Sequence, residues 1–151
     1  MKWLALAFAL LVVPPALSLI APAALAQTAA APAGPSTPMT PAPDDRAKQW
    51  LTLLDDKNYS DSYNQLAASA RSKISVDSWS TKFGALREPL GAMATRTIKD
   101  VKLTKTLPGM RDGQYATVRF DSSFAHKAAA TETVVLTSEK GGWSVISYAV
   151  D

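Results

Sequence analysis

The stretch LREPLGAMATR, from Leu86 to Arg96, separates two different hydrophobic patterns in this chain. Before it, apolar residues recur every three or four positions, which is typical of helices packed on one face. After it, apolar and polar residues alternate, which is typical of half-buried strands. Pro89 should end the last helix, because the residue before a proline is pushed out of the helical region. The stretch therefore predicts helices first and a sheet second.

Three helices are predicted on the N-terminal side of this stretch. The first begins near Pro43 and ends near Lys57, the second is capped by Ser60, and the third is capped by Ser75. Their apolar faces consist of Ala47, Trp50, Leu51 and Leu54; of Tyr63, Leu66, Ala67 and Ala70; and of Val76, Trp79, Phe83 and Leu86. We interpret the aromatic members of these faces as core residues.

Four strands are predicted on the C-terminal side, with turn-forming residues between them. They run from Arg96 to Leu107, Tyr115 to Phe124, Thr131 to Glu139, and Trp143 to Val150. Ile98 is out of phase with Val101, which predicts a bulge near Lys99. Three helices followed by a four-stranded antiparallel meander define an α+β domain.

The N-terminal segment predicts export. Residues 1–26 combine Lys2, a long apolar run and an Ala-Leu-Ala site before Gln27, as a secretory signal peptide does. Residues 27–43 are rich in Ala and Pro and uncharged, which predicts a disordered linker ahead of a single domain at 44–151. We favour cleavage over a retained anchor, because prolines interrupt the apolar run, and so expect no stable membrane insertion. A bacterial periplasmic or secreted location follows, and the absence of cysteine excludes a disulfide framework.

Composition argues against several classes of partner and cofactor. Removing Lys2 leaves 15 of the 16 basic side chains against 13 acidic ones, a net charge of +2 mixed along the chain, so we expect no nucleic-acid partner. His126 is the single histidine, so we expect no metal site. The sequence has no phosphate loop and no dinucleotide fingerprint, so we expect no cofactor.

A set of short motifs spans most of the predicted domain, from Trp50 to Tyr148. They are Tyr59-Ser60-Asp61-Ser62, Trp79, Arg87-Glu88-Pro89-Leu90-Gly91, Arg96, Leu107-Pro108-Gly109, Asp112-Gly113-Gln114-Tyr115, Phe124, Lys127, Glu132-Thr133-Val134, Trp143 and Tyr148. In this order and spacing they resemble the secreted bacterial family called domain of unknown function 4019. The resemblance implies a small exported domain without an established activity. The order of elements is also similar to cystatin-like and nuclear-transport-factor-2-like (NTF2-like) folds, in which a curved sheet forms a cone around a helix.

Four residues form the candidate site: Arg87, Arg96, Glu132 and Tyr148. The Pro-Leu-Gly turn should bring both arginines to one end of the domain, where Glu88 or Glu132 could pair with them. Glu132 shares a strand face with Val134, and a buried carboxylate needs a partner. We favour a structural ion pair over a ligand-binding cluster, and we assign no catalytic residue.

Two function hypotheses follow from these residues. The first is an exported, non-catalytic binding or accessory module whose partner is a protein or a small molecule, with a homodimer as a further option. The second is a small pocket enzyme of the isomerase or hydratase kind, which would use Glu132 with Tyr148 or Tyr115. The second hypothesis requires Glu132 to open into a cavity and to have a raised pKa.

Overall fold

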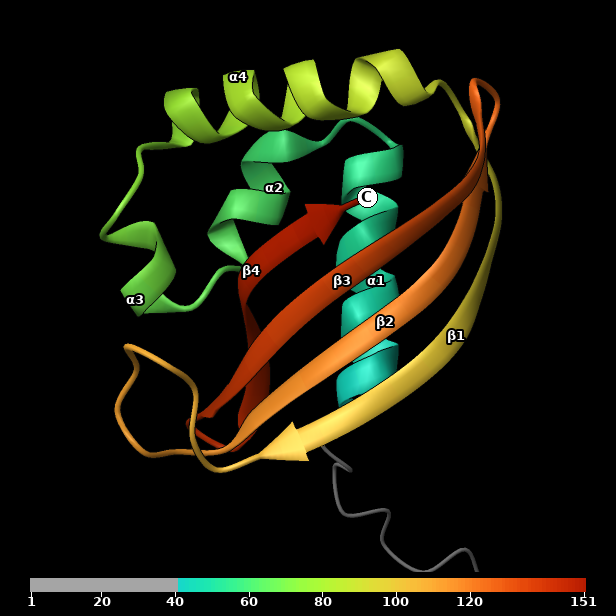
Figure 1. Cartoon of the computed structure of the whole chain (residues 1–151). Helices are drawn as coiled ribbons and strands as arrows, with labels where there is room; N and C mark the ends of the chain where they lie inside the picture. Colours follow the sequence, from blue (N-terminus) through green and yellow to red (C-terminus); the bar gives the residue numbers. More distant parts are fainter. Residues whose placement is uncertain (1–40) are drawn as a thin grey trace, which may run out of the picture. The chain divides into compact units, whose positions relative to one another are not determined.

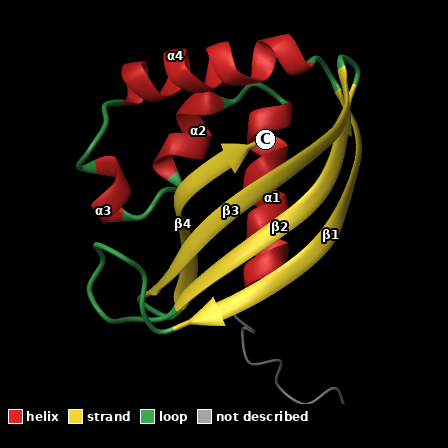
Figure 2. Ribbon diagram, in the orientation of Figure 1, coloured by secondary structure: helices red, strands yellow, loops and turns green. Residues whose placement is uncertain are grey.

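The computed structural model describes residues 41–151, which fold into helices and one sheet (Figure 1). The predicted signal peptide and most of the predicted linker lie outside the described residues. The elements are α1 (Pro43–Asp55), α2 (Tyr59–Asn64), α3 (Ala68–Arg71), α4 (Val76–Arg87), the 3-10 helix η1 (Glu88–Leu90), β1 (Met93–Thr104), β2 (Tyr115–Phe124), β3 (Lys127–Glu139) and β4 (Gly142–Val150). The helices thus precede the strands, as the α+β prediction requires (Figure 2).

The prediction of three helices is wrong in one place, because the second predicted helix is two short helices. The backbone N–H of Ala67 donates to the carbonyl of Val145 at 2.8 Å, and Leu66 forms a parallel bridge with that residue. This contact with β4 pulls the chain out of helical geometry between α2 and α3. The cap is also different, because the Asn58 side chain, rather than that of Ser60, accepts from the N–H of Asp61.

The turn from helix to strand follows the sequence prediction. Ser75 caps α4 by accepting from the N–H of Ser78, and α4 ends at Arg87, two residues before Pro89. Gly91 then has a φ of +77°, in the region that favours glycine. The imidazole of His126 packs over this glycine, where a Cβ would lie about 3.0 Å from the ring, so a side chain would fit poorly.

The sheet is antiparallel with the order β1-β2-β3-β4. The predicted bulge is confirmed: Ile98 pairs with Phe120 and Asp100 with Arg119, so Lys99 is the extra residue. β3 begins at Lys127, four residues earlier than predicted, and pairs with β2 through a tight turn at Ala125 and His126. No helix within residues 41–151 is long and apolar enough to cross a membrane.

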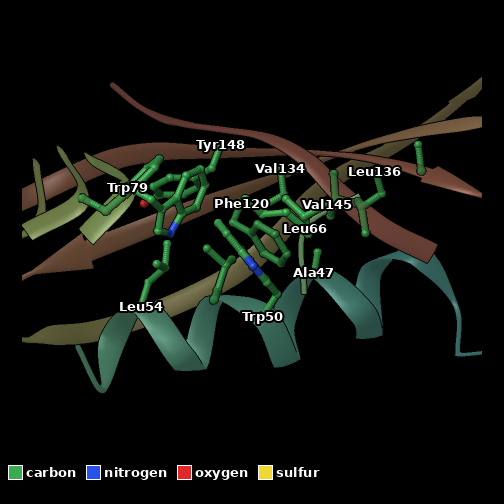
Figure 3. Close-up of a cluster of buried hydrophobic side chains, with 14 residues drawn as sticks. Ala47, Trp50, Leu54, Leu66, Trp79, Phe120, Val134, Leu136, Val145 and Tyr148 are labelled. Atoms are coloured by element: carbon green, nitrogen blue, oxygen red, sulfur yellow. The ribbon is translucent and has the colours of Figure 1, made fainter. Parts of the chain in front are cut away.

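The core lies between α1 and the inner face of the sheet (Figure 3). Trp50 and Leu54 point from α1 toward Phe120, Val134 and Tyr148 on the strands (Figure 3). The indole N–H groups of Trp50 and Trp79 donate to the carbonyl and hydroxyl of the buried Ser62, at 2.9 and 3.0 Å. Trp50, Trp79 and Phe83 are therefore core residues, as predicted, and Tyr63 packs partly buried against this core.

The two edges of the sheet differ. β4 is covered where Leu66 and Ala67 pair with Val145, next to α2 and α3 (Figure 1). β1 lies at the opposite edge, and in the described part of the chain its only strand partner is β2. Within residues 41–151 the sheet therefore has one covered edge and one open edge.

Candidate functional site

The structure brings the four predicted site residues together at one end of the domain. Arg87 is the last residue of α4, Arg96 lies on β1, Glu132 on β3 and Tyr148 on β4. Strand alternation turns Glu132 inward, between Phe120 on β2 and Val150 on β4, with which it pairs. Glu88, the other predicted partner, is exposed, and Tyr115 donates instead to the carbonyl of Arg111.

Glu132 is the centre of the cluster, and its side chain is fully buried. Its Oε1 accepts from Nη1 of Arg87 at 2.8 Å and from the hydroxyl of Tyr148 at 2.7 Å. Its Oε2 accepts from Nε of Arg96 at 2.6 Å and from the hydroxyl of Ser122 at 2.6 Å. Nη2 of Arg96 adds a further bond to Oε1 at 3.1 Å. Both carboxylate oxygens are therefore saturated with donors.

Two members of the cluster were missed by the sequence analysis: Asp55 and Ser122. Asp55, at the end of α1, accepts two hydrogen bonds from Arg96, at 2.7 and 3.0 Å, and one from Nη2 of Arg87. A signal for both was present in the sequence. Asp55 follows Leu51 by four residues on the apolar face of α1, and Ser122 lies between Phe120 and Phe124 on the inner face of β2.

These six residues form what we call the Glu132 network, namely Asp55, Arg87, Arg96, Ser122, Glu132 and Tyr148. Its two guanidinium groups face two carboxylates, so the formal charges cancel. Arg87 also lies over the ring of Phe124, with its guanidinium carbon 4.8 Å from the ring centroid. The network therefore joins the ends of α1 and α4 to all four strands.

The electrostatics of the network favour a charged Glu132, a charged Arg96 and a neutral Tyr148 at neutral pH. Burial alone raises the pKa of Glu132, but hydrogen bonds from Arg96, Ser122 and Tyr148 and the charge of Arg96 bring that pKa below its ordinary value of 4.5. Burial and then the Glu132 charge raise the pKa of the Tyr148 hydroxyl above its ordinary 10.0. Hydrogen bonds to Asp55 and Glu132 outweigh burial and raise the pKa of Arg96.

This arrangement does not meet the requirement of the isomerase or hydratase hypothesis. A general base needs a cavity in which a substrate can reach it, and a pKa near the working pH. Glu132 is sealed, its pKa is lowered, and its oxygens are occupied. Beside the network, a cavity of about 30 Å³ lined partly by Asp55 and Arg87 has room for a water molecule only.

The hollows of residues 41–151 that are large enough for a ligand do not expose Glu132, which is fully buried. One of about 450 Å³ is lined by Thr97, Ser123 and other residues of the sheet, and its lining includes Ser122 of the network. Another, of about 350 Å³, is lined by Leu103, Tyr115 and Trp143 near one end of β1. No group of three or more residues that could hold a metal ion occurs within the described range.

The fold and the family are defined by comparison with known proteins. Among solved structures, the chain is similar to an NTF2-like protein from Campylobacter jejuni that is named as a proposed transpeptidase. The TM-score is 0.51 and the identity 16%, over 70% of this chain and 97% of that chain. The domain is therefore an NTF2-like α+β cone.

The family model "Protein of unknown function (DUF4019)" matches residues 46–148. The chain belongs to this family, as the motifs predicted. A search of curated proteins found no match.

Proposed function

We propose that this chain is an exported binding or accessory module rather than an enzyme. The observation that carries the proposal is the saturation of Glu132, the fully buried carboxylate of the domain. A catalytic acid or base would be left with a free proton position facing a cavity. Here Oε1 instead accepts a bond that joins α4 to the sheet, and Oε2 accepts bonds from the neighbouring strands β1 and β2.

The name of the Campylobacter jejuni protein does not change this proposal. Transfer of an acyl group needs an activated nucleophile, such as a serine or cysteine beside a base. This chain has no cysteine, and the imidazole of His126 packs over Gly91 rather than bonding to a hydroxyl in the described region. We therefore do not extend a transpeptidase activity to this chain.

Export rests on the sequence of residues 1–26. Cleavage before Gln27 would release a chain whose first 17 residues, 27–43, act as a tether for the folded domain. A periplasmic or secreted binding module built in this way could present its domain away from an attachment point. The partner would be a protein or a small molecule, and nucleic acid is disfavoured by the mixed charge.

Native mass spectrometry of the chain purified from its own host tests the proposal. A mass that begins at Gln27 supports export, and a mass that begins at Met1 overturns it. The same spectrum reports a dimer, a bound protein or a retained small molecule.

A turnover assay addresses the enzyme alternative separately. The purified chain is incubated with extracts of periplasmic metabolites, and their consumption is followed by mass spectrometry. Steady turnover that disappears on a single substitution would contradict a non-catalytic module. No turnover, together with a stoichiometric partner, is the result that we expect.

A further inference from the structure

The exposed large hydrophobic side chains of residues 41–151 all lie on one strand, β1. They are Ile98, Val101 and Leu103, with 40%, 41% and 65% of their surface exposed. Their partners on β2 are Phe120, Val118 and Ala116, which are buried on the inner face of the sheet. The three exposed side chains therefore share one face, and they continue the apolar inner face of the sheet to its edge.

The bulge at Lys99 keeps these side chains on that face. Ile98 and Val101 are three residues apart, so a regular strand would turn them to opposite faces. Lys99 and Asp100 both point outward instead, where they form ion pairs with Asp121 at 2.9 Å and with Arg119 at 2.6 Å. Between Ile98 and Leu103, β1 thus presents apolar side chains on one face and charged side chains on the other.

An apolar hollow lies at the end of this strip. It has a volume of about 350 Å³ and is lined by Leu103, Thr104, Lys105, Gln114, Tyr115 and Trp143. Since Leu103 belongs to both, the strip and the hollow form one surface. The hollow is within the size range of pockets that accept a large apolar side chain or a small ligand.

The charges beside this surface are only partly neutralised. Lys99 is paired with Asp121, whereas Lys102 and Lys105 form no ion pair with any residue in 41–151. Lys102 pairs in register with Thr117 on the outer face, and Lys105 lines the hollow. An occupant of this edge therefore meets two unpartnered cations.

We infer that the β1 edge binds an extended segment of another protein, with apolar side chains on one face and acidic side chains on the other. The segment adds to the sheet as a fifth strand, so its backbone pairs with the open edge. Its apolar side chains cover Ile98, Val101 and Leu103, and one of them enters the hollow beside Trp143. Its acidic side chains lie near Lys102 and Lys105. This inference rests on the proposed function and names its partner.

The second half of the β1 edge has little of the usual protection against such pairing. Edge strands commonly avoid partners by a bulge, by lysines, by turning a charged side chain inward or by a cover of helix or loop. On β4 the cover is present, because Leu66 and Ala67 pair with Val145. On β1 the inward charge of Arg96 and the bulge at Lys99 both lie in the first half of the strand, whereas the residues from Asp100 to Thr104 pair regularly with β2 and turn the apolar Val101 and Leu103 inward.

A synthetic peptide provides the test with the chain purified from its host. The probe is a capped peptide of about seven residues, which is a usual length for a strand. Glutamate alternates with leucine along this peptide. Binding is followed by tryptophan fluorescence and by amide hydrogen exchange. We expect saturable binding, a blue shift that is lost in Trp143→Phe, and slower exchange of the β1 amides.

Two control peptides and a pair of variants test the individual parts of the inference. The first control peptide has alternate backbone amides N-methylated, so it cannot pair along the edge. The second has lysine in place of glutamate, which reverses its charge. Both peptides should bind at least about tenfold more weakly than the original peptide. Leu103→Glu should weaken binding of the original peptide by a similar factor. Ala149→Glu, at an exposed position on β4 at the opposite edge of the sheet, is the matched control and should bind as the parent chain does.

Several results would overturn the inference. Equal binding of the N-methylated peptide would exclude strand addition, and protection of amides outside β1 would place the site elsewhere. A dimer of the chain that occupies β1 would identify a second copy as the occupant instead. Absence of peptide binding would reject the β1 surface but not the module function, which only turnover in the separate assay would reject.

Discussion

Glu132 carries its charge where water cannot reach it. The ionised side chain is therefore stabilised only by the hydrogen-bond donors around it. Glu132→Gln keeps the shape of the side chain but removes the charge that faces Arg87 and Arg96. Breaking a buried ion pair by removing one partner leaves the other charge uncompensated. We expect the free energy of unfolding to fall by about 3–5 kcal/mol, measured by urea denaturation with tryptophan fluorescence.

The control for this substitution lies on the same strand. Glu139 is the exposed last residue of β3, with no ion pair in the described range, so Glu139→Gln should change the free energy of unfolding by less than about 0.5 kcal/mol. If Glu132→Gln were as mild as this control, the network would not be a stabilising element.

The pH dependence of stability follows from the shifted pKa values in the network. The pKa of Glu132 is below 4.5 in the folded chain, so its contribution is present above pH 4.5 and is lost as the pH falls through the folded value. The pKa of Tyr148 is above 10.0, so its contribution is complete below pH 10.0 and is lost as the pH rises further. The free energy of unfolding should therefore decrease at both extremes.

Substitution separates the two limbs of this profile. Glu132→Gln should reduce the acid decrease, and Tyr148→Phe should reduce the alkaline one, when urea unfolding is repeated across pH. Tyr59 should leave a residual alkaline slope, because burial also raises its pKa. An unchanged acid limb in Glu132→Gln would assign that limb to other carboxyl groups.

The sequence predicted only part of the Glu132 network, because its members differ in how clearly they break the apolar pattern around them. Glu132 and the two arginines stood out because a charge interrupts an apolar pattern or flanks a turn. Asp55 and Ser122 are small polar residues on otherwise apolar faces, and such residues are more often tolerated than functional. Their role became visible only when the fold placed them within bonding distance of Arg96 and Glu132.

Among the elements, β1 offers a test of register. Because Lys99 is the extra residue of the bulge, its deletion should restore regular pairing and leave Arg96 and Val101 on the inner face. We expect a change in the free energy of unfolding of at most about 1 kcal/mol, together with loss of the ion pair to Asp121.

Deletion of Thr97 from the same strand is the matched comparison. It shifts Arg96 by one position relative to β2, so the guanidinium faces away from Glu132. The decrease in the free energy of unfolding should then approach the decrease caused by Glu132→Gln in the same urea experiment. Equal effects of the two deletions would contradict this register argument.

The elements were predicted best where one periodicity dominated. The strands, the bulge and α4 follow directly from alternation or from a cap. The division into α2 and α3 could not be predicted, because Leu66 and Ala67 fit the helical spacing, and the contact that removes them from the helix comes from distant Val145. The early start of β3 was missed because Ala128, Ala129 and Ala130 carry no alternating signal.

At the scale of the folded domain, residues 41–151 contain a core of their own. The buried hydrophobic residues of this range lie between Ala47 and Tyr148. A chain of residues 41–151 should therefore unfold with the same free energy as a chain of residues 27–151, to within about 0.5 kcal/mol. Urea denaturation of the two purified chains checks this, and a larger difference would show that residues 27–40 stabilise the domain.

The position of Tyr148 near the end of the chain has a consequence for the order of folding. Arg87 and Tyr148 are 61 residues apart, and the helices of the domain come before any of the strands. While the chain emerges from its N-terminal end, Asp55 and Arg87 can pair with each other, but Glu132 and Tyr148, which also bond to Arg87, are still missing. The Glu132 network is therefore incomplete until β4 is present. The domain should reach its full stability only after this last strand has formed.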